Sequence, residues 1–138
     1  MGDLTVTAAQ VAACYPTKAE IFDGIAAETI TAGQAVYIVV ASALLGLADE
    51  DAAESSWVWG IALNGGGAGQ AISVLRRGHV YGFALSSLAY CAPVSLSATA
   101  GALLDTSATT NIVARCVPLS DSNLTKVLFV DCTLAAQT

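Results

Sequence analysis

The chain carries a single histidine, His79, and this is the side chain best suited to act as a general base. It lies in the segment Arg76-Arg77-Gly78-His79-Val80-Tyr81, where a turn signal leads into a strand-like pattern. No Gly-x-Ser-x-Gly motif marks a nucleophile, and a strand histidine is ordinarily exposed or hydrogen-bonded. We therefore predict that the protein is not an enzyme. The alternative, a small hydrolase, requires His79 within hydrogen-bond reach of Cys91, Cys116 or a serine.

Carboxylates gather between Asp49 and Ser56, where four of the residues are Asp or Glu. Close carboxylates repel unless they are solvated or bind a metal ion. The Asp-x-Asp-x-Asp-Gly pattern of a calcium-binding EF-hand loop is missing, so a solvated loop is the prediction and a calcium site the alternative. Three other aspartates, Asp105, Asp121 and Asp131, lie in or beside turn signals, where they would cap backbone groups.

Four cysteines are spread singly along the chain, and no Cys-x-x-Cys pair is present to supply zinc-site spacing. They are Cys14, Cys91, Cys116 and Cys132. We predict buried, reduced thiols that pack as small hydrophobic groups, with disulfide pairing left open because it depends on the distance between Cβ atoms. We predict no metal and no cofactor.

The glycine-rich segment Asn64-Gly65-Gly66-Gly67-Ala68-Gly69 invites comparison with phosphate-binding loops. A P-loop needs Gly-Lys-Ser/Thr and a following helix, whereas the next residues, Gln70 to Leu75, alternate as a strand. The segment therefore predicts a hairpin turn that uses the positive φ angles open to glycine.

Two pairs of residues are candidates for contacts with another molecule. Trp57 and Trp59 flank Val58, so on a strand both indoles would face one side, in the core or as a platform for a sugar or a protein. Arg76 and Arg77 are adjacent, so a strand would send them to opposite faces, one to a carboxylate and the other to solvent or a partner.

The composition limits the possible partners. Hydrophobic residues make up 55% of the chain and charged residues 12%, too little charge to cover a monomer's surface, so apolar subunit contacts are expected. With five Lys plus Arg and a net charge of −6, we expect no nucleic-acid partner. The longest apolar run, residues 35–48, is shorter than the roughly 20 residues of a membrane-spanning helix, so we expect no membrane segment.

Short segments rich in Val, Ile, Leu, Thr and Tyr recur between turn residues, a pattern that predicts an all-β domain of ordinary size. The predicted strands are Glu20–Ile25, Ala35–Val40, Leu44–Ala48, Val58–Leu63, Ala71–Leu75, Gly78–Ala84, Pro93–Ser95, Leu103–Leu104, Ile112–Pro118 and Lys126–Thr133.

The first 19 residues lack this regularity. They are rich in Ala and Thr, and Pro16 interrupts them. We predict an irregular N-terminal arm, residues 1–19, that orders on contact with neighbours, followed by a β domain, residues 20–138. A frayed terminus or a short helix between Thr5 and Tyr15 are the alternatives. Tyr15 and Pro16 are accordingly candidate interface residues.

A series of short motifs appears in a recognisable order. Its parts are Thr29-Ile30-Thr31-Ala32-Gly33-Gln34-Ala35-Val36-Tyr37, Trp59-Gly60-Ile61-Ala62-Leu63, Gly69 to Val80 with Arg77-Gly78-His79-Val80, Cys91-Ala92-Pro93-Val94, Ile112-Val113-Ala114-Arg115-Cys116-Val117 and Val127-Leu128-Phe129-Val130. In this order the chain, over about residues 28 to 132, resembles the capsid cement or head-decoration proteins of tailed phages. One turn departs from the family pattern, because Tyr90-Cys91-Ala92-Pro93-Val94 lacks the expected glycine.

The resemblance implies a compact β-barrel or β-tulip-like single domain, often a homotrimer. It implies a structural virion protein on the outer surface of the capsid, bound to the major capsid protein at capsomer junctions. The contacts would then include Trp57, Trp59, Arg76, Arg77, Tyr15 and Pro16. The alternative is a trimeric tail or fibre adhesion module that binds a host surface glycan through Trp57 and Trp59.

Overall fold

The computed structural model describes residues 3–52, 54–105 and 112–132 and confirms the all-β prediction. The described chain holds ten strands and two short 3-10 turns, Ala8–Gln10 and Pro16–Lys18. The strands are β1 (Ala12–Ala13), β2 (Glu20–Ile25), β3 (Ala35–Ile38), β4 (Leu45–Leu47), β5 (Val58–Ala62), β6 (Ala71–Tyr81), β7 (Pro93–Leu96), β8 (Leu103–Leu104), β9 (Ile112–Pro118) and β10 (Lys126–Asp131).

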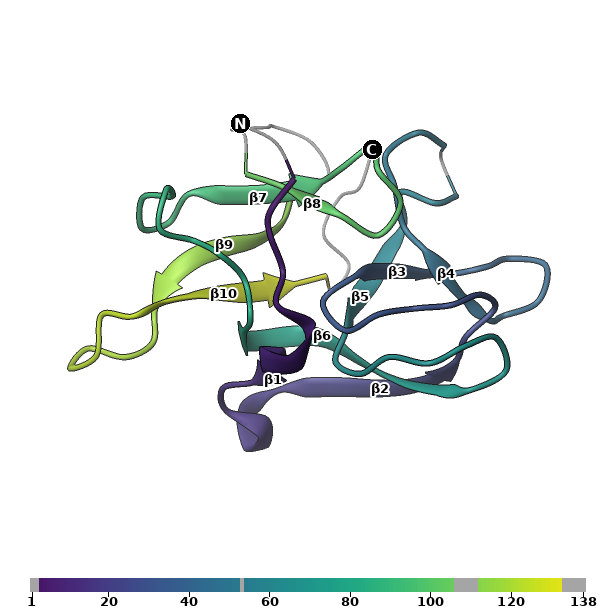
Figure 1. Cartoon of the computed structure of the whole chain (residues 1–138), viewed down its shortest axis with the longest axis horizontal. Coiled ribbons are helices and arrows are strands. Elements are labelled where there is room, and N and C mark those ends of the chain that lie inside the picture. Colours follow the sequence, from purple (N-terminus) through teal and green to yellow (C-terminus); the bar gives the residue numbers. More distant parts are fainter. Residues whose placement is uncertain (1–2, 53, 106–111, 133–138) are drawn as a thin grey trace.

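All ten strands belong to one antiparallel sheet in the order β4-β3-β5-β6-β10-β9-β7-β8, with β1 and β2 also paired to β6 (Figure 1). The long strand β6 is central because it pairs with four strands, β2 and β5 along its first half and β10 and β1 along its second. Between these halves the register shifts opposite Glu20 and Ile21, and Gly78 has a φ of 146°. Glycine tolerates this conformation, so the strand bends without ending.

The sheet curls so that its ends approach other parts of the chain. At one end an isolated bridge joins Ala26, just after β2, to Leu45 of β4. At the other end Asp3 pairs with Leu104 of β8, and Val6 pairs with Phe83 just after β6. The barrel-like curvature thus depends on short contacts at both ends.

Two hydrophobic cores lie within the curled sheet. The larger core includes the fully buried side chains of Leu75, Val80, Val94, Leu96 and Leu128. The smaller core consists of Ala26, Ile30, Val36, Leu45, Ala62, Ile72 and Val74. Strand β6 serves both because successive side chains point to opposite faces of a strand: Val74 lies in the small core and Leu75 in the large one.

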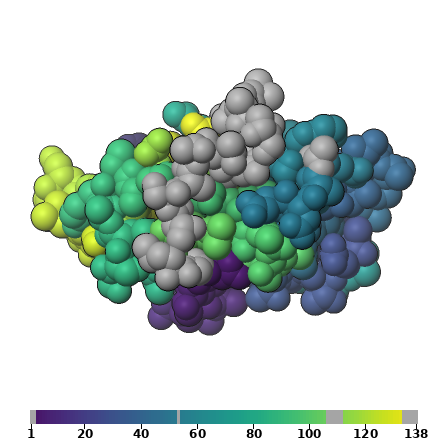
Figure 2. Space-filling model, turned by 90° about the horizontal axis from the view of Figure 1, so that it is seen from above, coloured from purple at the N-terminus to yellow at the C-terminus, as the bar shows by residue number. Residues whose placement is uncertain are grey.

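Residues 3–19 lie against the β strands of the same chain, as Figure 2 shows for the purple N-terminal residues. Leu4 and Val11 are each 8% exposed and belong to the large core, and β1 pairs with β6 through Ala12 and Ala13. Core contacts are therefore present on both sides of the boundary predicted at residue 19. The short helix considered between Thr5 and Tyr15 is replaced by a 3-10 turn and β1.

Most predicted strands agree with the structure, and three match to the residue: β2, β8 and β9. One prediction was wrong, because Ala71–Leu75 and Gly78–Ala84 are not two strands: the continuous strand β6 runs to Tyr81. The strand predicted to end at Thr133 ends at Asp131, and Thr133 lies outside the described residues.

Candidate interaction surfaces

The two tryptophans lie in different environments. Trp59 packs against the small core, with the Arg76 guanidinium carbon 3.7 Å from the centre of its ring and the edge of Phe22 5.4 Å from it, centroid to centroid. Trp57, one residue before β5, is 55% exposed. Trp59 is thus covered by its own chain, and Trp57 is the indole that is available to another molecule.

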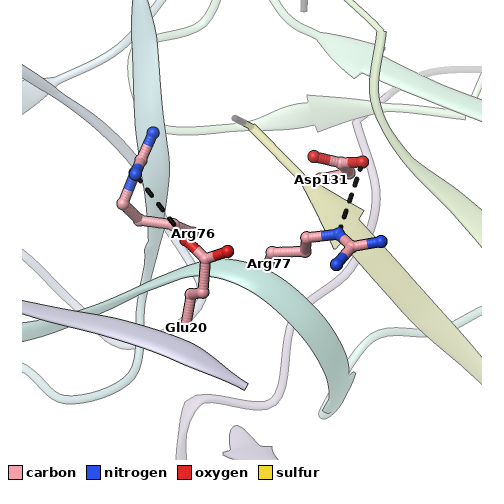
Figure 3. Close-up of polar contacts among 4 residues, drawn as sticks. All are labelled: Glu20, Arg76, Arg77 and Asp131. Atoms are coloured by element: carbon pink, nitrogen blue, oxygen red, sulfur yellow. Dashed lines mark ion pairs between the residues drawn. The ribbon is translucent and has the colours of Figure 1, made fainter. Parts of the chain in front are cut away.

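Both adjacent arginines have carboxylate partners on neighbouring strands (Figure 3). Arg76 lies 3.8 Å from Glu20 of β2, and Arg77 lies 3.7 Å from Asp131 of β10. The two guanidinium groups point away from each other in Figure 3, and their side chains are 18% and 54% exposed. Arg77 is therefore the outward arginine, and ion pairs as exposed as this one contribute little to stability.

The side chains of Trp59, Arg76 and Phe22 cover the small core. Two buried nitrogen atoms among them, Arg76 Nε and Trp59 Nε1, lack a hydrogen-bond partner in the described structure. An unpaired buried donor costs free energy. The stacked contact of the guanidinium with the indole face offsets part of this cost, because the π face attracts the cation.

Exposed Trp57 follows the loop that carries Asp49, Glu50, Asp51 and Glu54, and its amide donates to the Glu54 carbonyl at 3.1 Å. We call Trp57 together with these four carboxylates and Glu28 the acidic surface. Three of these carboxylates accept backbone amides: Glu54 Oε2 accepts the Val40 amide at 2.8 Å, Glu28 Oε2 the Leu47 amide at 3.1 Å, and Asp49 Oδ1 the Asp51 amide at 3.0 Å. Burial raises the pKa of Tyr37, and the nearby carboxylates of Glu54, Glu28 and Asp49 raise it further. In this part of the described chain, no group of three or more metal-binding side chains comes together.

His79 packs among aromatic rings on the outer side of β6. Its ring centroid lies 5.3 Å from that of Tyr15, edge to face, and 5.0 Å from that of Phe129. Burial lowers the pKa of His79, and the positive charge of Lys18 lowers it further.

The sheet register separates His79 from Cys116, one of the two cysteines that the hydrolase alternative named. His79 lies opposite Phe129, which lies opposite Arg115, whereas Cys116 lies in the next row with Leu128 and Val80, inside the large core. Adjacent rows face opposite sides of a sheet, so His79 and Cys116 do too. Among the described contacts, none joins the His79 ring to a serine or cysteine by a hydrogen bond.

Cationic side chains surround this aromatic row, and we call Tyr15, Lys18, Arg77, His79, Arg115 and Phe129 together the cationic face. Lys18 Nζ lies 5.8 Å from the centre of the Tyr15 ring, and the Arg77 guanidinium carbon lies 5.7 Å from that of Phe129. Arg115 donates to the Cys91 carbonyl at 3.0 Å. A hollow of about 150 Å³ opens beside Phe129 and Arg115. Pro16, predicted with Tyr15 as an interface residue, is exposed in the adjoining 3-10 turn.

A larger hollow of about 320 Å³ lies between the N-terminal segment and the loops at 31–34 and 99–102. Its walls are small aliphatic residues with Thr31, Gln34 and Thr99, and Gln34 Oε1 accepts the Thr31 amide. None of the described residues that line this hollow is ionisable, so they supply neither an acid nor a base.

Strand β2 is an exposed edge strand that sequence reasoning did not single out. Ile21, Phe22 and Ile25 are 45%, 37% and 43% exposed. Ala26 exchanges backbone hydrogen bonds with Gly69 and Gln70, so by antiparallel alternation the amides and carbonyls of Ile21, Asp23 and Ile25 point away from β6. Beyond Ile25 the chain meets β4, because the Ala27 amide donates to the Leu45 carbonyl at 2.7 Å. The strand combines the exposed carboxylates Glu20 and Asp23 with the apolar residues Ile21, Phe22 and Ile25, and its sequence alone does not indicate that it lies at an edge of the sheet.

The four cysteines are free thiols in the described structure. Cys116 and Cys132 are buried as predicted, and burial raises the pKa of Cys132 to about 12. Cys14 is half-buried, and Cys91 is exposed, so the prediction of burial was wrong for Cys91. Its φ of 69° is in the left-handed region that favours glycine.

Comparison with known proteins found no matching family model, no similar curated protein and no similar solved structure. None of the helical segments in the described ranges is long and apolar enough to cross a membrane.

Proposed function

We propose that this protein is a capsid decoration protein that binds the major capsid protein on the outside of a phage head, at capsomer junctions, and stabilises the shell. In this proposal the protein acts as a homotrimer and performs no catalysis. Many copies of a small domain that bridges neighbouring capsomers strengthen a shell because each copy binds the assembled state and not the dissociated one.

The observation that carries the proposal is the exposed apolar edge of β2. Soluble proteins protect such edges with charge, proline or a covering segment, because free amides and carbonyls beside apolar side chains recruit other chains. Here Ile21 remains exposed beside outward-pointing backbone groups, and the Ile25 side chain is exposed where the strand reaches its bridge to Leu45 of β4. A permanent protein partner would cover this edge and bury its apolar side chains.

Three residues within the motifs that carry the family resemblance lie at turns or at a bend of the sheet, and this supports the same proposal. Gly33, with a φ of 93°, precedes β3, and Gly78 lies at the bend of β6. Cys91 takes a glycine-like conformation before β7. The motifs thus correspond to structural corners of the sheet.

The test is to mix the purified protein with undecorated capsids assembled from the major capsid protein of the same genome, and to image them by cryo-electron microscopy. Density at symmetry-related sites on the outer surface is the expected result. Ile21→Lys with Ile25→Lys should reduce the occupancy strongly, whereas Leu124→Lys, a change at a residue 63% exposed in the β9–β10 turn, should leave it unchanged. Bare capsids at saturating protein would overturn the proposal.

A second function is favoured by one observation, the exposure of Trp57 beside carboxylates. Aromatic faces stack on sugar rings, and carboxylates accept hydrogen bonds from sugar hydroxyls. A tail or fibre adhesion module would use this surface to bind a host glycan. Binding to a glycan array that is lost in Trp57→Ala would support this function, and an array without signal would eliminate it.

A further inference from the structure

The cationic face concentrates positive charge in a protein of net charge −6. Lys18, Arg77 and Arg115 belong to it, which is three of the five Lys and Arg residues in the chain. Lys18 and Arg115 are exposed and have no carboxylate partner among the described ion pairs. Aromatic rings between cations offer flat apolar contact area together with charge, the combination found at binding hot spots.

The same chain presents a surface of complementary chemistry. The acidic surface holds five carboxylates, and those of Glu50 and Asp51 are exposed and take no part in the hydrogen bonds that hold the loop. Exposed Trp57 beside them can receive a guanidinium on its face, as Trp59 receives Arg76 in the core cover.

The described ion pairs join neither surface to the other within one molecule. The acidic surface lies with β3, β4 and the loop before β5, in the right half of Figure 1, and the cationic face lies on β6, β10 and β9, further to the left. Strand β9 follows β3 by four places in the sheet, and neighbouring strands are about 4.8 Å apart. Mobile ions screen exposed charges beyond about 8 Å at physiological ionic strength.

We propose that the cationic face of one copy binds the acidic surface of a second copy. Glu50 and Asp51 of one molecule then pair with Lys18 and Arg115 of the next, and Trp57 packs against the aromatic row. Because the two surfaces differ, the contact is heterologous and repeats from copy to copy until a ring closes. This inference rests on the self-association in the proposed function and is independent of capsid binding.

A second copy fits the cationic face better than nucleic acid does. Phosphate backbones need several clustered cations without carboxylates among them, whereas Asp131 lies beside Arg77 and the whole chain is acidic. The described acidic surface supplies carboxylates and an aromatic anchor together, which matches the cationic face in both respects.

The test is sedimentation equilibrium of the full-length protein without capsids. The wild type should associate, and raising NaCl from 50 mM to 1 M should weaken association because the Debye length falls to about 3 Å. Lys18→Glu with Arg115→Glu should raise the dissociation constant by on the order of tenfold or more, and Glu50→Lys with Asp51→Lys should do the same.

The decisive variant combines all four substitutions in one chain. It has the net charge of the wild type, since two cations and two anions have exchanged sign, and it should recover association. Restoration cannot result from misfolding, so this variant separates lost pairing from lost structure. Ala68→Glu and Asp121→Lys, on exposed turns outside both surfaces, are control charge changes that should leave association unaltered.

Three results would overturn the inference. The wild type could be monomeric, the two double charge reversals could leave the dissociation constant unchanged, or the variant with all four substitutions could fail to associate. Capsid occupancy is measured separately. An associated protein that leaves capsids bare would overturn the capsid role alone, whereas decorated capsids with charge-insensitive association would overturn this inference alone.

Discussion

The two hydrophobic cores share strand β6 but are closed in different ways. The large core is enclosed by β9, β10, β7 and the N-terminal segment, and its fully buried members are mostly Val, Leu and Ile side chains. The small core lies beneath β3 and β4 at the end of the sheet and is covered by Trp59, Arg76 and Phe22. One core is sealed by aliphatic packing and the other by an amphipathic stack that contains unpaired nitrogen atoms.

This difference indicates where the domain can adjust. A core bounded on all sides by paired strands relaxes little when a side chain is removed, because neighbouring backbone is fixed by hydrogen bonds on both edges. The small core is bounded by β4, which among the described strands pairs with β3 alone, apart from the bridge between Leu45 and Ala26. We expect it to tolerate change better than the large core.

The largest effect should come from removing matched leucines, Leu128 in the large core and Leu45 in the small one, which are 0% and 1% exposed. Leu128→Ala should lower the free energy of unfolding by about 4 kcal/mol and Leu45→Ala by about 2 to 3 kcal/mol, since the second site can collapse further. Urea unfolding monitored by circular dichroism measures both. Equal losses would contradict the view that the small core is the more adaptable.

The junction between the cores is the next most sensitive place. A Cβ atom on Gly60 would lie 2.5 Å from the Leu75 carbonyl oxygen and 2.5 Å from Val74 Cγ1. Because one of these atoms is backbone, Gly60→Ala should cost about 3 kcal/mol. Gly67→Ala is the matched control, since its Cβ would meet only Gln70 Oε1 at 3.8 Å, and its effect should stay within about 0.5 kcal/mol. A mild Gly60→Ala variant would show that β5 and β6 can separate.

The cover of the small core should depend on packing more than on charge. Arg76→Ala removes the stack over Trp59 and should cost about 2 kcal/mol, whereas Arg76→Met keeps apolar cover and should cost less than about 1 kcal/mol. In a Trp57→Phe background, acrylamide quenching reports Trp59 alone and should increase only in the alanine variant. Similar losses for both would mean that the Glu20 ion pair holds the cover.

The sequence predicts strands far better than it predicts their partners. Segments rich in strand-favouring residues and bounded by turn residues locate β2 and β9, because strand propensity and turn signals are local properties. It cannot reveal that Ala12 and Ala13 pair with β6, nor that Arg76 covers Trp59, since these contacts join residues distant in the chain. The bend at Gly78 resembles a turn in sequence, which is why one strand was predicted as two.

The smallest expected effect concerns the two residues other than glycine that have positive φ in the described chain, one near each core. Cys91, before β7, has a φ of 69°, and Ala43, before β4, has a φ of 62°. The left-handed conformation costs a residue with a Cβ atom about 1 to 2 kcal/mol, and replacing it by glycine removes this cost. Glycine also has more conformational freedom in the unfolded chain, which cancels about 0.5 to 1 kcal/mol of that stabilisation. Cys91→Gly and Ala43→Gly should therefore each stabilise the protein by up to about 1 kcal/mol, seen as a rise of about 3 °C in Tm.

Cys91→Ala is the control that separates backbone strain from the loss of the thiol, because alanine has the same left-handed penalty and should leave Tm unchanged. The Cys91 carbonyl remains available to Arg115 in every variant, so the backbone conformation is the quantity that changes. If Ala43→Gly stabilises the protein and Cys91→Gly does not, contacts with β9 hold the turn before β7 in its conformation. The turn beside the large core would then be more rigid than the turn beside the small core.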